Sequence, residues 1–337
     1  METEFKGRII FSENYQSTIE SIKLINKSQD GKVSITSAHQ GDETDSTDSV
    51  LKVIPGYENI TKISSENLKP VEVEILSAYD ESILELNSLE GKVRCISHCA
   101  VIQSKNEYIP AAFVSLKFYT KSKIIDATAT ELSDIIRSDD LSKVINEEYI
   151  KERKYFLSKA APQNSLIFID GALFSGASTS GNFLLIEDLL KLNCKPIFFV
   201  KNSDSTIITE RFEFAKGYNS DLHWAYVNLE EGEVSQVFSY ISKEGRGKAM
   251  CFMKVFKGRS PIRIEFPLKP FLEGYYLNEI FDLIYYQYLA NGSVNNVQPR
   301  IIQVAEMYAR EILKSTNLYK EIERMGLTKS MNEERGF

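Results

Sequence analysis

Two charged side chains stand at the ends of apolar runs, where they could act on phosphate. Asp170 follows the run 166–169 and precedes Gly171, and Lys201 follows the run 195–200. A carboxylate at the end of a central strand can bind a metal ion or a proton, and a lysine beside it can hold a phosphate or orient the acid. The plainer alternatives are that Asp170 and Gly171 form only a turn and that Lys201 is only a solvated lysine.

The two runs are predicted to be neighbouring strands. Run 166–169 holds four apolar residues, three of them β-branched or aromatic, as in a buried strand. A predicted helix over 183–192 separates it from strand 195–200, and two strands joined by a helix form a parallel βαβ unit. Asp170 and Lys201 are therefore expected to leave the same edge of the sheet.

The remaining sequence predicts a sheet with helices packed on it. A hairpin is expected from strands 93–102 and 108–119, joined at Lys105 and Asn106. In segment 262–267 charged and apolar residues alternate, which predicts a half-exposed strand whose Arg263 contacts phosphate or pairs with an acid. Further predicted strands are 123–127, 224–227 and 250–256, and predicted helices are 15–25, 71–89, 130–161, 275–289 up to Gly292, and 301–313 after Pro299.

Composition limits the class of protein. The 337 residues are 43% apolar and 26% charged, as in soluble globular proteins. A net charge of −7 argues against a generally basic nucleic-acid coat but leaves room for a local basic channel. The four cysteines form no Cys-x-x-Cys pair, which favours free thiols in a reducing compartment. Neither a secretory signal nor a window of about 18 apolar residues is visible, so we expect a cytoplasmic protein that does not contact membranes.

Three segments together resemble the NurA family of archaeal and bacterial DNA-repair nucleases. The first is a helix containing Glu152, followed by Ile169-Asp-Gly-Ala-Leu173. The second is the strand that ends in Phe199-Val-Lys-Asn-Ser-Asp-Ser205. The third is Ile262-Arg-Ile-Glu-Phe-Pro267, followed by a long helix, a glycine break and Gln298-Pro-Arg-Ile-Ile-Gln-Val-Ala-Glu306.

The resemblance implies an α/β fold with an RNase H-like mixed β-sheet and flanking helices over residues 91–315. Residues 1–90 would be an N-terminal helical and loop region, and 316–337 a polar tail. It also implies a homodimer that docks on a HerA-type hexameric ATPase, a DNA translocase, passes DNA through a local basic channel and resects DNA ends with Mn²⁺ or Mg²⁺. Hydrolysis by two metal ions needs several clustered carboxylates.

The family's functional residues carry over only in part. Asp170 matches the second conserved aspartate and Glu152 the helical glutamate, so both are candidate metal ligands. The family's first aspartate falls on Ser97, whose neutral hydroxyl cannot replace a carboxylate, and the neighbouring His98 would point to the opposite face. At the family's terminal tyrosine and histidine stand Gln298 and Glu306, and Glu306 could supply a compensating carboxylate. Another register would use Asp42, Asp45 or Asp48 from an acidic loop expected to be flexible.

These residues lead to three functional hypotheses. The first is a NurA-like component of a DNA-end-processing complex whose nuclease activity is weak or lost. The second is an active Mn²⁺- or Mg²⁺-dependent 5′ exo/endonuclease that uses Asp170, Glu152 and Glu306, with Lys201 and Arg263 on the nucleic acid. The third is a scaffold unrelated to DNA, favoured if no positive groove surrounds Lys201, Arg263 and Lys254.

Overall fold

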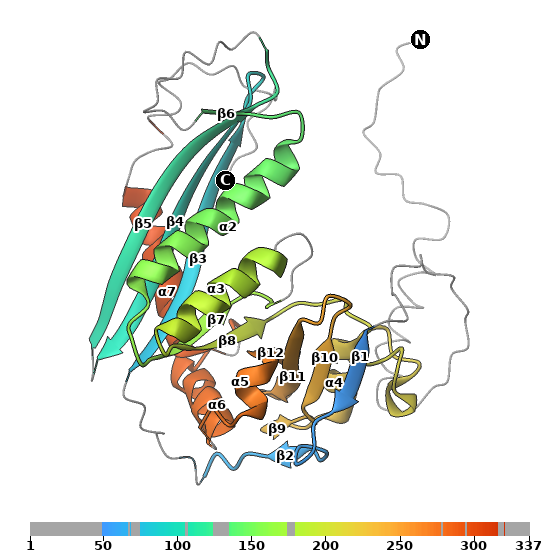
Figure 1. Cartoon of the computed structure of the whole chain (residues 1–337). Helices are drawn as coiled ribbons and strands as arrows, with labels where there is room; N and C mark the ends of the chain where they lie inside the picture. Colours follow the sequence, from blue (N-terminus) through green and yellow to red (C-terminus); the bar gives the residue numbers. More distant parts are fainter. Residues whose placement is uncertain are drawn as a thin grey trace, which may run out of the picture.

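The computed structural model describes residues 49–66, 68, 75–104, 107–123, 135–173, 179–277, 279–293, 295–315 and 320 (Figure 1). Several sequence predictions lie outside these residues: the helix 15–25, nearly all of the acidic loop 41–49, the turn at Lys105 and Asn106, and most of strand 123–127. No helix in this described part of the chain is long and apolar enough to cross a membrane.

One sheet of 12 strands organises the structure, in the order β1-β10-β11-β12-β8-β7-β3-β4-β5-β6, with β2 and β9 paired beside β11. The strands are β1 (Val50–Val53), β2 (Thr61–Lys62), β3 (Leu76–Asn87), β4 (Lys92–Ser104), β5 (Glu107–Thr120), β6 (Ile135–Arg137), β7 (Leu166–Asp170), β8 (Lys195–Val200), β9 (Glu233–Val234), β10 (Phe238–Ile241), β11 (Gly247–Lys254) and β12 (Ile262–Pro267).

The middle of the sheet has the mixed pattern expected from the sequence. Strands β3, β4 and β5 form an antiparallel meander, β7 runs parallel to β3, and β8 runs parallel to β7. Strand β12 then pairs antiparallel with β8. The RNase H-like mixed sheet with flanking helices is confirmed, as are the hairpin and the βαβ unit that ends in β8.

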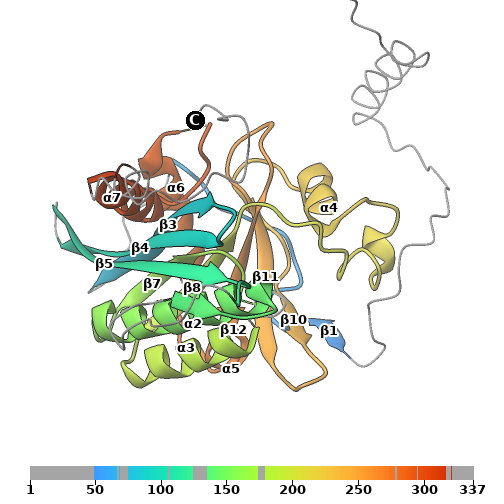
Figure 2. The same ribbon diagram turned by 90° about the horizontal axis from the view of Figure 1, so that it is seen from above.

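Helices cover both faces of this central region (Figure 2). They are α2 (Leu141–Ala160), α3 (Thr179–Lys191), α4 (Asp221–Asn228), α5 (Leu268–Leu272), α6 (Ile280–Asn291) and α7 (Arg300–Ser315). The apolar side chains of α2 and α3 pack on one face with Tyr79 and Ile169, and those of α6 and α7 pack on the other with Phe168 and Phe199.

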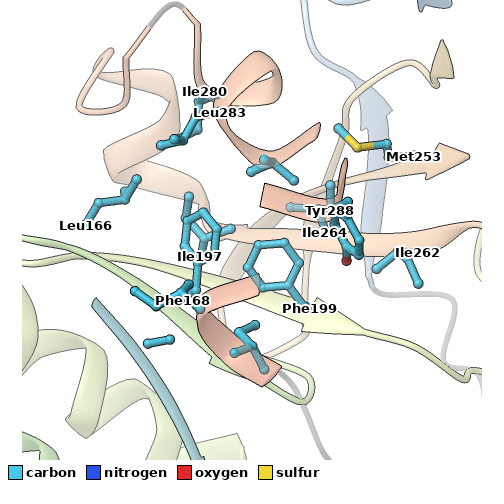
Figure 3. Close-up of a cluster of buried hydrophobic side chains, with 14 of the residues drawn as sticks. Leu166, Phe168, Ile197, Phe199, Met253, Ile262, Ile264, Ile280, Leu283 and Tyr288 are labelled. Carbon is cyan, nitrogen blue, oxygen red and sulfur yellow. The ribbon is translucent and has the colours of Figure 1, made fainter. Parts of the chain in front are cut away.

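The core on the α6 side fixes the ends of the central strands. Figure 3 shows Phe168 of β7 and Phe199 of β8 among side chains from β12 and α6, and their ring centroids are 4.8 Å apart. Both rings are fully buried. Burying a side chain of this size contributes roughly 1.5–3 kcal/mol, so β7 and β8 are held rigidly up to the residues that end them.

Five predicted elements differ in the structure. The predicted helix 71–89 contains strand β3, because pairing with β4 and β7 outweighs the local preference. The predicted strand 224–227 lies in α4, which Ser220 caps by accepting from the His223 backbone N–H. The predicted helix 130–161 begins only at Leu141, after β6, and the predicted helix 275–289 begins only at Ile280.

The fifth difference is in β12. The strand exists, but all six of its residues are buried, so the prediction of a half-exposed strand is wrong. Its charged residues Arg263 and Glu265 are buried because Lys248 of the neighbouring β11 completes an ion cluster with them. Alternation of charged and apolar residues therefore marks two buried faces here, one apolar and one ionic.

Candidate functional site

Asp170 and Lys201 meet where β7 and β8 end. After Asp170, Gly171 has a φ of 98°, a conformation that favours glycine, and turns the chain away. Lys201 follows the last residue of β8, and its Nζ donates to Asp170 Oδ2 at 3.1 Å. The Asp170 side chain is 26% exposed and the Lys201 side chain is 31% exposed. The predicted meeting of these residues at one sheet edge is confirmed, and the pair is open to solvent.

A second aspartate, Asp80 of β3, lies beside Asp170. In the parallel pairing of β3 with β7, Tyr79 is the partner of Ile169, and Asp80 and Asp170 are each the next residue along. Successive residues of a strand point to opposite faces. Tyr79 and Ile169 face α2 and α3, so both carboxylates lie on the face that α6 and α7 cover.

Both carboxyl groups lack full compensation by cations. Asp80 is only 6% exposed, and burial, followed by the charges of Asp170 and Glu81, raises the pKa of Asp80 to about 8. Burial also raises the pKa of Asp170, against the opposing effect of Lys201, and the charges of Glu81 and Glu306 raise it further. With a pKa of about 8, Asp80 retains its proton near neutral pH. A bound cation would favour the ionised form of both carboxyls.

Helix α7 brings a third acid, Glu306, whose charge reaches Asp170. Glu306 accepts a hydrogen bond from Gln298 Nε2 at 2.8 Å and forms an ion pair with Arg310. Gln298 is fully buried, so it fixes the orientation of the Glu306 side chain. The structure thus brings Glu306 to the aspartate pair, and its catalytic role stays a prediction.

Glu152 lies elsewhere, on the α2 face of the sheet. It accepts from Ser115 Oγ at 2.9 Å, pairs with Lys117 Nζ at 3.0 Å, and lies 3.6 Å from His98 Nε2. Burial alone would raise the pKa of Glu152, but hydrogen bonds from His98, Lys117 and Ser115 lower it below the ordinary value. Glu152 is therefore paired with Lys117 and Ser115 on the opposite face of the sheet from the Asp170 carboxylate.

The α2 residue that reaches Asp170 is Arg153. One position along a helix rotates a side chain by about 100°, so Arg153 points where Glu152 does not. Its guanidinium donates to the backbone oxygen of Asp170 at 3.4 Å and lies 5.1 Å from the centroid of the Tyr79 ring. A cation therefore supports the strand end from the α2 side.

Ser97 does not lie beside Asp170. It sits in the middle of β4, with its Cα paired to Ser82, one strand farther from β7 than Asp80. Ser97 is therefore not placed beside Asp170, and the carboxylate on the strand next to β7 is Asp80 of β3. His98, as predicted, faces the other side, where Tyr79 Oη and His98 Nδ1 are 2.7 Å apart. Asp42, Asp45 and Asp48 lie outside the described residues.

Two of the three expected nucleic-acid cations are engaged inside the protein. Arg263 is 5% exposed and contacts Glu265 and Ser203. Lys254 donates to the backbone oxygens of Tyr226 and Leu229 at 2.6 and 2.7 Å. Of the expected set, only Lys201 stands at the aspartate pair.

Other cations lie next to the site on α7. A surface hollow of about 330 Å³ along this helix is lined by Arg300, Arg310 and Lys314 and includes Glu306. Arg310 pairs with Glu306 and Lys314 pairs with Glu311, so part of this positive charge is balanced. This surface was not predicted from the sequence, because Glu306 was the one residue of the helix that was considered for the catalytic site.

The donor set at the strand ends fits a hard divalent cation. Mg²⁺ is commonly held by one or two carboxylates together with waters and substrate phosphates, and Mn²⁺ accepts the same oxygen ligands. Asp80 and Asp170 supply two such carboxylates. Among the described residues, no group of three or more His, Cys, Asp or Glu side chains is arranged to hold a metal ion, so Glu306 would have to move closer to become a third ligand.

Comparison with known proteins gives similarity in structure but not in sequence. No protein-family model and no curated protein matches the chain. The NurA nuclease from Sulfolobus solfataricus is similar over 93% of this chain and 99% of that one, at 14% identity and a TM-score of 0.48. A NurA structure with manganese is similar over 72% and 86%, at 9% identity and a TM-score of 0.44. Endonuclease V from Bacillus subtilis is similar over 75% and 88%, at 11% identity and a TM-score of 0.41. At these identities the similarity concerns the fold alone: the chain has a fold similar to that of NurA and Endonuclease V nucleases.

Proposed function

We propose that this chain is a divalent-metal-dependent nuclease in which Asp80 and Asp170 hold the metal ion. The main support is the pair of adjacent, poorly compensated carboxylates on neighbouring strands, Asp80 within β3 and Asp170 at the end of β7. Their raised pKa values mean that the protein alone does not satisfy them, whereas Glu152 is satisfied by its neighbours. Perturbed carboxylates gathered at a sheet edge are typical of functional sites.

Each residue of the site has a separate task in this proposal. A divalent ion held by the two aspartates would supply Lewis-acid activation of a phosphodiester and of water. Lys201 can exchange its bond to Asp170 for a bond to a phosphate oxygen. Glu306, oriented by Gln298, keeps a negative charge beside the pair and increases its attraction for cations. Arg300 and Lys314 offer the nucleic-acid backbone a place along α7.

The hypothesis of weak or lost activity is the second candidate, and it has its own support. Lys201 already pairs with Asp170, and Arg153 supports the same strand end from the other face. Two resident cations reduce the attraction for a third positive charge. In this alternative the chain keeps the fold of a nuclease and acts as a clamp or regulator.

The assembly proposed for the chain follows from the sequence resemblance. It is a homodimer that works with a HerA-type hexameric translocase in DNA-end processing in the cytoplasm. On α7, the apolar side chain of Met307 is 52% exposed, whereas that of Ile302 is fully buried. Met307 is therefore the one that can contact a partner, while Ile302 belongs to the core.

Calorimetry and a nuclease assay on the same samples test the proposed function. We expect the wild type to bind Mn²⁺ and to degrade DNA, and we expect Asp80→Asn and Asp170→Asn to lose both properties. Glu85→Gln, which changes an acid farther along β3 that pairs with Lys92, is the matched control and should behave as wild type.

Two outcomes would decide against the proposal. If the wild type binds no Mn²⁺ and leaves DNA intact, the hypothesis of lost activity takes its place. If activity persists in both aspartate variants, the nuclease site lies elsewhere. Ser97→Asp tests the alignment that places the family's first aspartate at Ser97. It should create no Mn²⁺ site, because Ser97 lies in the middle of β4.

A further inference from the structure

A buried ion cluster lies next to the site, in strands β11 and β12. Its members are Glu265, Lys248 and Arg263, which are 0%, 2% and 5% exposed. Lys248 Nζ donates to Glu265 Oε1 at 2.5 Å, and Arg263 Nε lies 2.9 Å from the same oxygen as a close ion pair without hydrogen-bond alignment. Burial alone would raise the pKa of Glu265, but the two cations lower it below the ordinary value.

The cluster contacts the segments that follow β7 and β8. The second oxygen of Glu265, Oε2, accepts from the backbone N–H of Leu173 at 2.8 Å. Arg263 donates from NH1 to Ser203 Oγ at 2.6 Å. One carboxylate and one guanidinium, neighbours on β12, therefore hold the first residues after Asp170 and the first residues after Lys201.

Other bonds also hold these two segments. The Gly171 backbone N–H donates to the Phe199 oxygen at 2.9 Å, Asn182 of α3 donates to the Leu173 oxygen at 3.0 Å, and Ser205 donates to Asp221 at 2.9 Å. The contacts to β12 act together with these bonds, at Leu173 in one segment and at Ser203 in the other. The separation of Asp170 and Lys201 thus depends on the shape of two short segments that rest on the ion cluster.

Stability alone does not account for such a cluster. Replacing a buried ion group by apolar residues is often neutral or stabilising, because the desolvation of the charges costs as much as their attraction returns. The benefit of a buried charge is directional, since a carboxylate with two oxygens fixes several donors at once. In this protein the fixed donors belong to the segments that carry the site.

We infer that Glu265, together with Lys248 and Arg263, is a positioning group that sets the geometry of Asp170 and Lys201 through Leu173 and Ser203. This inference rests on the proposed function for its consequence in metal binding, and on the contacts above for the positioning itself. Residues that orient a metal site from behind typically change affinity or activity by about 10- to 100-fold when they are replaced.

Three variants test the inference. Glu265→Gln keeps an acceptor for Leu173 but removes the charge. Ser203→Ala removes the bond from Arg263 to the segment after β8, and it also removes the acceptor of the Ser205 backbone N–H. Ser235→Ala is the matched control, because Ser235 is a buried serine that accepts from Phe252 on β11 and touches neither segment. Ser203→Ala keeps the test decisive if Glu265→Gln does not fold.

Hydrogen–deuterium exchange is measured first, without metal. We expect the amides of residues 171–173 to exchange faster in Glu265→Gln and those of 201–204 to exchange faster in Ser203→Ala, while Ser235→Ala leaves both segments as in wild type. The Ser205 amide is left out because it donates to Ser203 itself. Calorimetry with Mn²⁺ should then show affinity lowered about 10-fold or more in Glu265→Gln, by less in Ser203→Ala, and not in the control.

The outcomes separate this inference from the proposed function. Unchanged exchange in both segments overturns the positioning role, whether or not the wild type binds Mn²⁺. Wild type that binds no Mn²⁺ ends the proposed function, while faster local exchange would still establish the positioning role. Mn²⁺ affinity that stays at the wild-type value in variants with faster exchange shows that the cluster supports the segments without affecting the site, and this also overturns the inference.

Discussion

Two sets of carboxylates on opposite faces of the same sheet differ in the cations and hydrogen-bond donors that surround them. On the α2 and α3 face, Glu152 and Glu265 have cations and hydrogen-bond donors close by, and their pKa values are lowered. On the α6 and α7 face, Asp80 and Asp170 have raised pKa values, and among the described residues Lys201 is the cation that bonds to a carboxylate oxygen of the pair. The first set is complete without a ligand, whereas the second set is completed by a proton or a metal ion.

Stability measurements give the largest expected effect of this difference. Glu265→Ala leaves two buried cations without their anion and should lower the free energy of unfolding by about 3–5 kcal/mol. Asp80→Asn removes a carboxyl whose pKa is raised from 3.8 to about 8. It should increase the free energy of unfolding at pH 8, without metal, by about 2–4 kcal/mol. Urea unfolding measures both changes.

The gain from Asp80→Asn also has a definite pH dependence. The folded state holds the Asp80 proton more tightly than the unfolded state, so Asp80 lowers stability progressively as pH rises from about 4 to about 8. The difference between Asp80→Asn and wild type should therefore be small near pH 4. Equal losses of stability in the Asp80 and Glu265 variants would remove the distinction between the two faces.

The pH dependence of Mn²⁺ binding sharpens the comparison. Asp80 must lose its proton to bind a metal, and its pKa is about 8. Each pH unit below that value lowers affinity about tenfold, so Mn²⁺ should bind about 100-fold more weakly at pH 6 than at pH 8. Calorimetry in buffers of different ionisation enthalpy should also detect proton release. Affinity independent of pH would mean that Asp80 is already ionised or is not a ligand.

The smallest effect concerns Lys201, the lysine that pairs with Asp170. Lys201→Met removes a partly exposed ion pair, and such pairs contribute about 0.2–1 kcal/mol. Mn²⁺ affinity should therefore rise by at most about fivefold, because a competing cation is gone. Nuclease activity should fall, because Lys201 is the cation that bonds to Asp170 and would contact the phosphate there. A variant with full activity would assign Lys201 to structure alone.

The sequence was most informative where strands are apolar on both faces. Strand β8 has the predicted limits, and β7 extends the prediction by Asp170 alone, because a short β-branched and aromatic run has few other ways to be buried. The same signal precedes Asp80, since residues 75–79 are mostly apolar and the acid follows. This apolar run followed by an acid was not recognised in the sequence, because β3 continues for seven residues beyond Asp80 instead of ending in a turn.

The sequence did not predict the arrangement of the site where a shift of one position changes the direction of a side chain. Glu152 and Arg153 are adjacent in sequence, but only Arg153 reaches Asp170, and helical rotation cannot be fixed without the packing of α2. Likewise, the alternation of charged and apolar residues correctly predicted a strand at β12. The charged face is buried because Lys248 of another strand pairs with Glu265, and no local sequence pattern predicts that pairing.

The continuation of β3 has a mechanical consequence. From Leu76 to Asn87 the strand is one unbroken ladder with β4, and α2 runs alongside the long strands (Figure 1). Asp80 therefore lies inside a continuous strand, with residues paired to β4 on both sides of it. The backbone that carries the carboxylate is thus held in place by the sheet before any ligand binds.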